Sequence, residues 1–490
     1  MMKIFETGLG PVEGHVEGGC IRVSRLRYAK SPVGSRRFAR PEPLEPWSEP
    51  VGGPGPAVAP PQLPSRLARV MGDYPFEQSE DCLHLDIWIP RGAEAPLPVF
   101  VFIHGGAFQT GGGSLECYNG GTLAARERII VVTITSRLGL LGFMPIEGLA
   151  PANLALQDQL AALRFIRANI EAFGGDADNI TLGGQSAGAN SAAIFMMHPE
   201  GRSLFKRGIL MSGMLTGTVR DPDAASAIGQ RFLAKMGVGR DDVERLRVMD
   251  LAQLMEAQQS IIVDQVQSAG LDSIALPFLP VADGDLVSND LMATFETGVA
   301  AWCPMMVGAT REEFAAFWFD NEQMEEAGGQ LLRQRFAEAF PDAPEATLER
   351  ARRRRTPRTN IAALVDFHSH MMMIEPARRE AAAHARMGAT AFAYQVDWQS
   401  PVPELGACHC IDLPMLFGNL DTWQNAAMIA GASRSELEGL RETVQGAVGS
   451  FVRTGDPNPG VGIDWPAFGT DGNVLHYDRV SHCETRHAYP

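Results

Sequence analysis

Short, mostly apolar segments alternate along this chain with longer segments whose apolar residues recur at helical spacing. Apolar runs of this length are typical of strands buried on both faces of a sheet, and helical spacing predicts amphipathic helices. We expect strands at 83–89, 98–103, 129–134, 179–183, 208–212, 305–307 and 391–394, and helices at 154–170 and 189–197. Strands that alternate with helices predict an α/β protein whose central, mostly parallel sheet is flanked by helices.

Other segments differ from this alternating pattern. Residues 1–30 alternate apolar and polar positions around glycine turns, which predicts an N-terminal hairpin or meander. Residues 32–64 are rich in proline and glycine, so we expect a long ordered loop across the surface. Residues 220–270 and 320–385 are polar and helix-rich, and we interpret them as helical insertions that cap the C-terminal edge of the sheet. We therefore favour one domain over residues 1–490, with two cap-like insertions.

The composition is that of a globular protein, with 45% hydrophobic and 20% charged residues. The formal net charge of −16 argues against a nucleic-acid partner, because such partners are bound through broad basic surfaces. The one basic run, at Arg350 and 352–355, is expected to be a solvated helix face.

Targeting and redox signals favour a cytoplasmic protein. No apolar run approaches membrane-spanning length, and the start of the chain lacks the apolar core of a secretory signal, so we expect no membrane partner. Seven cysteines at irregular spacings fit reduced thiols. Cys408 and Cys410 flank His409, but no second pair of metal ligands accompanies them. We expect no metal and no organic cofactor.

The motif Gly-Gln-Ser-Ala-Gly at 184–188 lies between a predicted strand and a predicted helix. In that context G-x-S-x-G is typical of a nucleophile elbow, a sharp turn that exposes its serine, here Ser186, at the edge of the sheet. A side chain at either glycine would clash with the adjoining strand or helix. The turn also places the Ala187 N–H group at a helix N-terminus, which favours a developing negative charge. Ser186 as a helix cap alone would leave the motifs below unexplained.

A second turn with adjacent glycines, at 104–108, directly follows the strand predicted at 98–103. A turn of this type completes an oxyanion hole in enzymes that carry the elbow, so we expect the N–H groups of Gly106, Ala107 and Ala187 to be its donors. Removing one such donor typically costs about a hundredfold or more in rate. Taken alone, the segment would be interpreted as a plain glycine turn.

A nucleophilic serine requires a histidine base and a carboxylate that orients it, and in the hydrolase order both follow the serine. His409 lies in a loop after the strand predicted at 391–394 and is the leading base. Glu312 and Glu313 both follow the strand at 305–307, and spacing alone does not choose between them. The histidines at 368, 370 and 384 fall in predicted cap helices.

Together these motifs resemble the type-B carboxylesterases, the group that includes cholinesterases and bacterial p-nitrobenzyl esterases. The resemblance covers nearly the whole chain in the same order, which argues against a chance match. The other matching blocks are 37–41, 79–85, 137–139, 158–159, 169–176, 308–313, 417–418 and 454–458. The resemblance implies an α/β-hydrolase fold and hydrolysis of carboxylic esters without a cofactor.

The family pattern also implies roles for single residues. It places the acid five residues after Gly308, at Glu313, and the histidine three residues after Gly406, at His409. These two would complete a triad with Ser186. The pattern further implies two structural ion pairs, Arg37 with Glu80 and Arg137 with Asp158.

Several positions depart from the pattern. Gln185 stands where many members carry glutamate before the nucleophile, which disfavours cationic, choline-like esters. Phe314 replaces the glycine that usually follows the acid and is expected to crowd that loop. Cys82 has no cysteine partner within 45–81, so the disulfide of many secreted members is not expected here. Ala155 and Phe165 replace a usual glycine and tryptophan.

We predict hydrolysis of a small-molecule substrate, an apolar, neutral ester of short to medium chain length. Because the same triad serves amides, carbamates and lactones, a hydrolase for these is the leading alternative. A non-catalytic binding protein is the alternative from another class, but this chain keeps all three triad positions and the glycines. The methionines at 371–373 either line a plastic apolar pocket or fill the core, and core filling is favoured. The sequence does not predict whether the protein is a monomer or a homo-oligomer.

Overall fold

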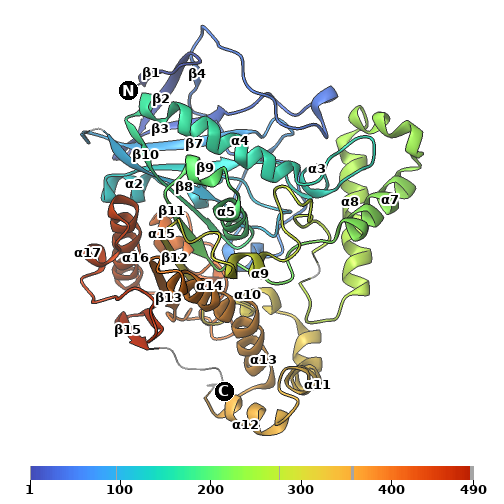
Figure 1. Cartoon of the computed structure of the whole chain (residues 1–490), viewed down its shortest axis with the longest axis vertical. Helices are drawn as coiled ribbons and strands as arrows, with labels where there is room; N and C mark the ends of the chain where they lie inside the picture. Colours follow the sequence, from blue (N-terminus) through green and yellow to red (C-terminus); the bar gives the residue numbers. More distant parts are fainter. Residues whose placement is uncertain (1, 95, 275, 355–357, 486–490) are drawn as a thin grey trace.

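The computed structural model describes residues 2–94, 96–274, 276–354 and 358–485. Within these residues, thirteen strands form one sheet in the order β1-β2-β3-β7-β9-β8-β10-β11-β12-β13-β14-β15, and β4 pairs with β2 beside this path. Figure 1 shows the sheet crossing the molecule between two layers of helices. The predicted α/β architecture is therefore confirmed.

The middle of the sheet is parallel from β9 to β14. Its strands are β8 (Leu97–Ile103), β9 (Ile130–Thr135), β10 (Gly175–Gln185), β11 (Arg207–Met211), β12 (Met305–Thr310), β13 (Ala391–Val396) and β14 (Asn473–Tyr477). All of the strands predicted for this region are present, although β10 begins at Gly175, earlier than the predicted start at 179.

Antiparallel strands extend the sheet at both ends. The N-terminal meander is present as predicted, and β15 closes the other edge. The bounds are β1 (Met2–Glu6), β2 (Pro11–Glu17), β3 (Cys20–Arg27), β7 (His84–Pro90) and β15 (His482–Thr485). The proline-rich segment at 32–64 is mostly loop, with the turn η1 (Gly34–Arg36) and the short strands β4 (Val51–Gly52) and β5 (Val58–Ala59), the latter paired with β6 (Glu77–Gln78).

Alternate side chains of the central strands pack into two separate cores. Val99, Val101 and Ile103 of β8 lie in one core, whereas Phe100 and Phe102 lie in the other. Both faces are thus covered, which explains why β8 is a continuous apolar run in the sequence. The first core includes α4 (Leu154–Asn169), α5 (Ala187–Met197) and α14 (Glu375–Arg386), and the second includes α2 (Gly121–Glu127), α15 (Leu413–Phe417) and α16 (Arg434–Thr454).

Residues 220–270 form two helices that lie together on one flank of the molecule (Figure 1). They are α7 (Pro222–Met236) and α8 (Leu251–Ser268), joined through the 3-10 segment η4 (Arg240–Arg247). The start of α7 is encoded locally, since the Asp221 side chain accepts from the N–H groups of Asp223 and Ala224.

Residues 320–385 form a second helical group, which lies well away from α7 and α8 in Figure 1. It comprises α11 (Glu322–Ala339), α12 (Pro344–Arg354), α13 (Asn360–Ser369), the π-helical turn η5 (His370–Ile374) and α14. Because α14 packs against β12 and β13, the last part of this segment belongs to the helical layer of the sheet. A cap role for the other helices stays a prediction.

The remaining helices are short and connect these elements. They are α1 (Ala68–Met71), α3 (Gly139–Phe143), α6 (Gly201–Leu204), α9 (Leu291–Glu296), α10 (Ala315–Trp318) and α17 (Asn458–Val461), with 3-10 turns η2 (Glu116–Tyr118), η3 (Ile170–Phe173) and η6 (Ala427–Ile429).

Both predicted ion pairs are present. Arg37 Nε donates to Glu80 Oε1 at 2.6 Å, and Arg137 Nε donates to Asp158 Oδ2 at 2.7 Å. The second pair is fully buried and joins the end of β9 to α4. Such pairs hold chain segments in one register, because separating them would leave a buried charge unpaired.

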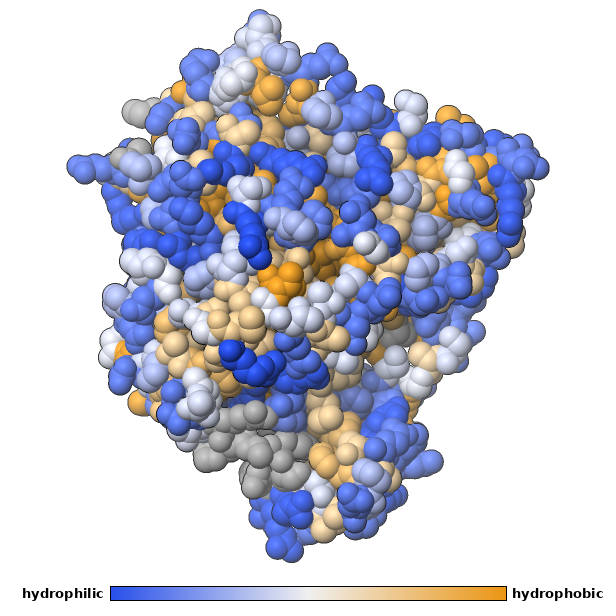
Figure 2. Space-filling view, in the orientation of Figure 1, coloured by the Kyte–Doolittle hydropathy of each residue, from blue (hydrophilic) through white to orange (hydrophobic). Residues whose placement is uncertain are grey.

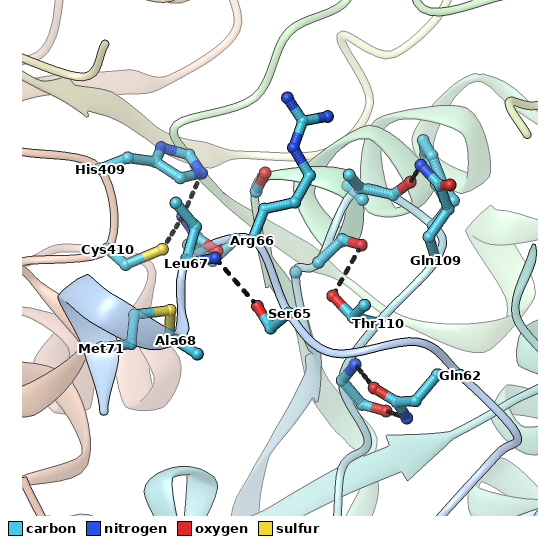
Figure 3. A pocket seen from close by; sticks show the side chains of 18 of the residues that line it. Gln62, Ser65, Arg66, Leu67, Ala68, Met71, Gln109, Thr110, His409 and Cys410 are labelled. Carbon is cyan, nitrogen blue, oxygen red and sulfur yellow. Dashed lines mark hydrogen bonds between the residues drawn. The ribbon is translucent and has the colours of Figure 1, made fainter. Parts of the chain in front are cut away.

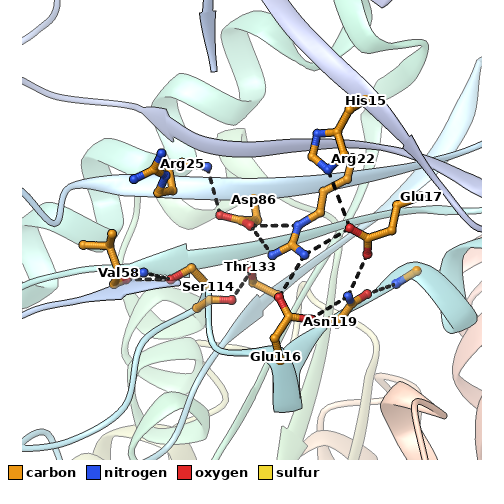
Figure 4. A network of polar contacts seen from close by, with 12 residues as sticks. His15, Glu17, Arg22, Arg25, Val58, Asp86, Ser114, Glu116, Asn119 and Thr133 are labelled. Atoms are coloured by element: carbon orange, nitrogen blue, oxygen red, sulfur yellow. Dashed lines mark hydrogen bonds and ion pairs between the residues drawn. The ribbon is translucent and has the colours of Figure 1, made fainter. Parts of the chain in front are cut away.

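A further polar network, partly buried, anchors the chain that follows the 104–108 turn (Figure 4). Arg22 of β3 donates to Asp86 of β7 at 2.9 Å and to Glu116 at 3.0 Å. Thr133 of β9 donates its hydroxyl to the Gly113 carbonyl at 2.6 Å. The segment 113–116 is therefore fixed to three strands, and this restrains the turn that precedes it.

The seven cysteines are free thiols, and Cys82 is buried. Among the described residues, no group of histidine, cysteine and acidic side chains has a metal-binding arrangement, and none of the helices has the length and apolar character needed to cross a bilayer.

Arg350 and Arg353 of the basic run are exposed on α12, and Arg355 lies outside the described residues. Figure 2 shows mainly hydrophilic residues on one face of the molecule, with hydrophobic ones gathered in a hollow near its centre.

We expect Asp158→Asn to lower the free energy of unfolding by roughly 3–5 kcal/mol, because it leaves the Arg137 guanidinium buried without a counter-charge. Urea unfolding followed by circular dichroism would measure this loss. The matched control is Arg164→Gln, which breaks an exposed pair with Glu200 and is expected to cost at most about 1 kcal/mol. Equal losses in the two variants would contradict a special role for the buried pair.

Candidate active site

Ser186 lies at the tight junction between β10, which ends at Gln185, and α5, which begins at Ala187. Its backbone is in a strained conformation, with φ 56° and ψ −123°. A Cβ at Gly188 would overlap the Ile103 carbonyl group, so the close approach of α5 to β8 requires glycine there. The same holds at Gly184, whose Cβ would overlap the backbone of Gly188. The local geometry is that of a nucleophile elbow.

His409 and Glu313 meet behind the elbow. His409 lies on the loop between β13 and α15, Glu313 follows β12, and His409 Nδ1 lies 2.5 Å from Glu313 Oε2. The other oxygen of Glu313 accepts from the Thr310 N–H group at 2.7 Å, and both side chains are buried. Glu312 instead accepts from the Ala407 N–H group at 2.6 Å. Spacing leaves the choice between the two glutamates open, and Glu313 is the one whose carboxylate contacts the His409 ring.

The other nitrogen of the ring faces Gln185. His409 Nε2 lies 3.1 Å from Gln185 Nε2. Because Nδ1 faces a carboxylate, the ring proton of neutral His409 belongs on Nδ1, and Nε2 then accepts from the Gln185 amide. The Ser186 hydroxyl makes no hydrogen bond to any described residue. In the structure His409 Nε2 is thus hydrogen-bonded to Gln185 and not to Ser186.

The electrostatic surroundings favour a proton on His409. Burial opposes the charged imidazole, but the acidic groups of Cys410 and Glu313 beside the ring outweigh it and raise the pKa of His409 above its usual value. The Phe317 ring lies 5.1 Å from the imidazole, centroid to centroid, and shields one side of it. A histidine in this setting is suited to accept and return a proton.

The 104–108 turn lies against the elbow. A Cβ at Gly105 would overlap the Gln185 side chain, and one at Gly106, where φ is 110°, would overlap the Thr110 carbonyl group. Within the described residues, neither the Gly106 nor the Ala107 N–H group donates a hydrogen bond. Burial lowers the pKa of His104 to about 4, and its Nδ1 lies 2.7 Å from the Gly105 carbonyl oxygen. His104 is therefore a neutral residue that shapes the turn.

A single cavity of about 430 Å³ connects these parts. Ser186, Gly106, Ala107, Ala187 and His409 all line it. Figure 3 shows His409 facing the chain segment that carries Ser65, Arg66 and Leu67 across the cavity. The five predicted groups are thus gathered at one cavity wall, with Glu313 buried behind them.

Comparison with known proteins agrees with this geometry. The carboxylesterase family model matches residues 2–488. The chain belongs to the carboxylesterase family. Para-nitrobenzyl esterase of Bacillus subtilis is 32% identical over 95% of this chain and 92% of its own length, and a probable N-octanoylanthranilate hydrolase of Rhodococcus erythropolis is 32% identical over 92% and 94%. A solved carboxylesterase of Geobacillus stearothermophilus superposes with a TM-score of 0.84 at 32% identity, covering 98% of this chain and 97% of its own.

This carboxylesterase is accordingly a carboxylic ester hydrolase of the α/β-hydrolase fold that acts on small-molecule substrates. Most of the cavity wall comes from residues that no sequence motif marks. Residues 62–78 form much of it, together with Gln258 and Ile262 of α8, Phe317 of α10 and Met373 of η5. Irregular loops carry no periodic signal, so no sequence pattern points to residues 62–78.

The contact between Gln185 and His409 was also not foreseen, although Gln185 lies inside the elbow motif. The other candidate histidines have structural partners. His368 Nε2 lies 3.1 Å from Asp272 Oδ2, and His384 Nε2 lies 3.0 Å from the Cys303 carbonyl oxygen. Neither lines the cavity beside Ser186.

We expect Gln185→Glu in this carboxylesterase to shift the acid limb of the pH–kcat/KM profile upward by about one pH unit. A carboxylate beside Nε2 stabilises the charged imidazole and raises the pKa of His409. Only the neutral ring accepts the serine proton, so activity would be lost at a higher pH as the solution is acidified. Initial rates on a chromogenic ester between pH 5 and 9 would measure the limb.

The control for this shift is Gln185→Met, which removes the amide without adding charge. Because it also removes a hydrogen bond that favours the neutral ring, it is expected to move the acid limb upward by clearly less than Gln185→Glu does. An equal upward shift in both variants would show that lost packing, and not charge, controls the pKa.

Proposed function

We propose that Ser186, His409 and Glu313 form the catalytic triad of this carboxylesterase, with the N–H groups of Gly106, Ala107 and Ala187 as its oxyanion hole. The observation that carries the proposal is the buried contact between His409 Nδ1 and Glu313 Oε2 beside a cavity that Ser186 also lines. Three chain segments, more than 90 residues apart, supply a nucleophile, a base and an orienting acid.

The proposed reaction begins when the Ser186 hydroxyl replaces the Gln185 amide at His409 Nε2. Ser186 Oγ bonds to the ester carbonyl carbon, its proton passes to Nε2, and the carbonyl electrons move to the oxygen held by the three N–H groups. Collapse of this intermediate breaks the bond to the alcohol, which leaves with the proton from His409. Water then attacks the acyl-enzyme, returns a proton to His409, and the carboxylic acid and free Ser186 are released.

The substrate that we propose is an apolar ester with an acyl chain of short to medium length. Support comes from the size of the cavity and from apolar side chains on its wall, among them Leu67, Met71 and Phe317. The para-nitrobenzyl esterase name of a relative also fits an ester with an apolar alcohol. Of the methionines at 371–373, Met373 lines the cavity, whereas Met371 and Met372 do not. A role in the pocket therefore stays a proposal for Met373 alone.

An amide substrate is the second candidate, because one relative is named for an N-acyl compound. The same attack on an acyl carbon serves both bonds, and the amide differs in needing a proton on its poorer leaving group. A binding protein without catalysis is less favoured, since such a role gives no reason for a strained serine beside an ordered histidine and glutamate.

The cytoplasm stays our proposed location. Its support is the set of free thiols, which suit a reducing compartment.

We expect Ser186→Ala to lower kcat/KM on p-nitrophenyl esters, from acetate to palmitate, by at least about ten-thousandfold, because no other group can form the acyl-enzyme. Ser191→Ala, on the same helix, is the matched control and should retain activity, since its buried hydroxyl lies outside the cavity lining. Stoichiometric labelling of the wild type by a fluorophosphonate probe, lost in Ser186→Ala, would identify the nucleophile. Full esterase activity in Ser186→Ala would refute the triad.

We expect Glu313→Gln to reduce kcat by roughly a thousandfold or more, because the amide no longer stabilises the imidazolium or fixes the ring proton on Nδ1. Glu312→Gln keeps an oxygen for the Ala407 N–H group and should cost far less. Steady-state kinetics on one ester for both variants would test the assignment, and a larger loss in Glu312→Gln would reverse it.

A further inference from the structure

A cation that forms no ion pair with any described residue lies on the wall of the active-site cavity. Arg66 belongs to the loop that borders the cavity opposite the elbow, and one of its Nη groups donates to the Ile274 carbonyl oxygen. Figure 3 shows its guanidinium group directed away from its own loop, in the same view as His409 and Gln109. The remaining guanidinium donors are therefore available to a molecule in the cavity.

Arg66 has no acidic partner within the part of the chain that the structure describes. No carboxylate of a described residue lies within ion-pair distance of it, whereas Arg69, on the next turn of chain, pairs with Asp320 at 2.9 Å. Among the described residues that line the cavity, Asp73 is the one with a carboxylate. Asp73 forms no ion pair with Arg66. Desolvation lowers the pKa of Arg66, although the residue as a whole is exposed to solvent, and an arginine keeps its charge at neutral pH.

The residue before Ser186 adds no negative charge to the cavity. Gln185 is a neutral amide, and its side chain is buried against His409. A cavity that contains a free guanidinium and little opposing charge has a local positive potential, although the whole chain carries a formal net charge of −16. Arg66 is exposed to solvent on this wall, and its charge attracts anions to the cavity although the net charge of the chain repels them.

We propose that Arg66 is a specificity-determining residue that binds a carboxylate carried by the ester substrate at a distance from the scissile bond. The guanidinium fork matches a carboxylate in two hydrogen bonds, which a neutral ester cannot supply. This proposal rests on the triad proposed above, and it extends the neutral ester expected from sequence to esters with one apolar body and one anionic end. The carboxylate belongs either to the acyl part or to the alcohol part.

The test compares matched anionic and neutral esters. Mono-p-nitrophenyl glutarate against p-nitrophenyl valerate probes the acyl part, and 4-acetoxybenzoate against 4-acetoxybenzamide probes the alcohol part. In Arg66→Gln we expect kcat/KM for the anionic member of one pair to fall about tenfold, while its neutral partner changes by less than about twofold. The pair that responds shows which part of the substrate carries the carboxylate.

Two variants serve as controls. Arg69→Gln removes the same charge from the adjoining helix α1, outside the cavity lining, and should change neither ratio. Arg66→Lys keeps the charge without the fork and should retain part of the preference. Equal changes for anionic and neutral esters in Arg66→Gln, or an equal effect of Arg69→Gln, would overturn the proposal.

Binding measured without turnover separates this proposal from the triad. In the Ser186→Ala background, calorimetric titration with each ester of a pair reports affinity alone. A preference for the anionic member that Arg66→Gln abolishes supports the carboxylate site even if the catalytic roles prove wrong. Equal affinities for the two members would overturn the proposal even if Ser186→Ala is inactive.

Discussion

The close contact between α5 and the end of β8 is the constraint on which the active site depends. Gly188 lies so near the Ile103 carbonyl group that no side chain fits, and Gly105 lies in the same way against Gln185. The elbow and the turn after β8 are therefore interlocked through glycines, and neither can move without the other. This contact sets the distance between the nucleophile and the N–H groups that would hold the oxyanion, so a backbone packing requirement becomes a catalytic one.

Two adjacent glutamates hold the polar groups of the site in place beside these turns. Glu312 holds the Ala407 N–H group and Glu313 holds His409, so two adjacent glutamates fix the same loop at two points. The buried carboxylates are acceptable because each accepts hydrogen bonds from partners that the sheet keeps in place. The ring of His409 is in turn limited by Gln185 and Phe317. Its orientation is thus determined before a substrate enters.

The sequence was sufficient for the sheet, the elbow and the family, because each rests on local signals. Continuous apolar runs mark strands such as β8 and β9, and the glycines at 184 and 188 mark a turn with no room for side chains. The sequence does not show whether Glu312 or Glu313 contacts the histidine, because both follow β12 at similar spacing. Which of them does so depends on the course of the chain after β12 and on the Thr310 and Ala407 N–H groups, which bind Glu313 and Glu312 respectively. The sequence also does not show that α14 packs on the sheet, because the polar composition of α14 resembles that of the helices before it.

The least predictable part of the molecule is also the part that contacts most of a substrate. Bond cleavage would use residues directly after β10 and β12, in the turn after β8 and on the loop between β13 and α15, which are anchored to the buried sheet. The rest of the cavity comes from residues 62–78, from α8 and from Phe317 and Met373, which pack outside the sheet. Changes there alter the shape and charge of the cavity with little cost to the core, whereas changes in the interlocked turns would disturb packing and chemistry together. This division gives a physical reason why proteins about one-third identical can keep one reaction and differ in substrate. It is also the reason why our proposal about the substrate rests on Arg66 of the outer wall and not on the proposed triad.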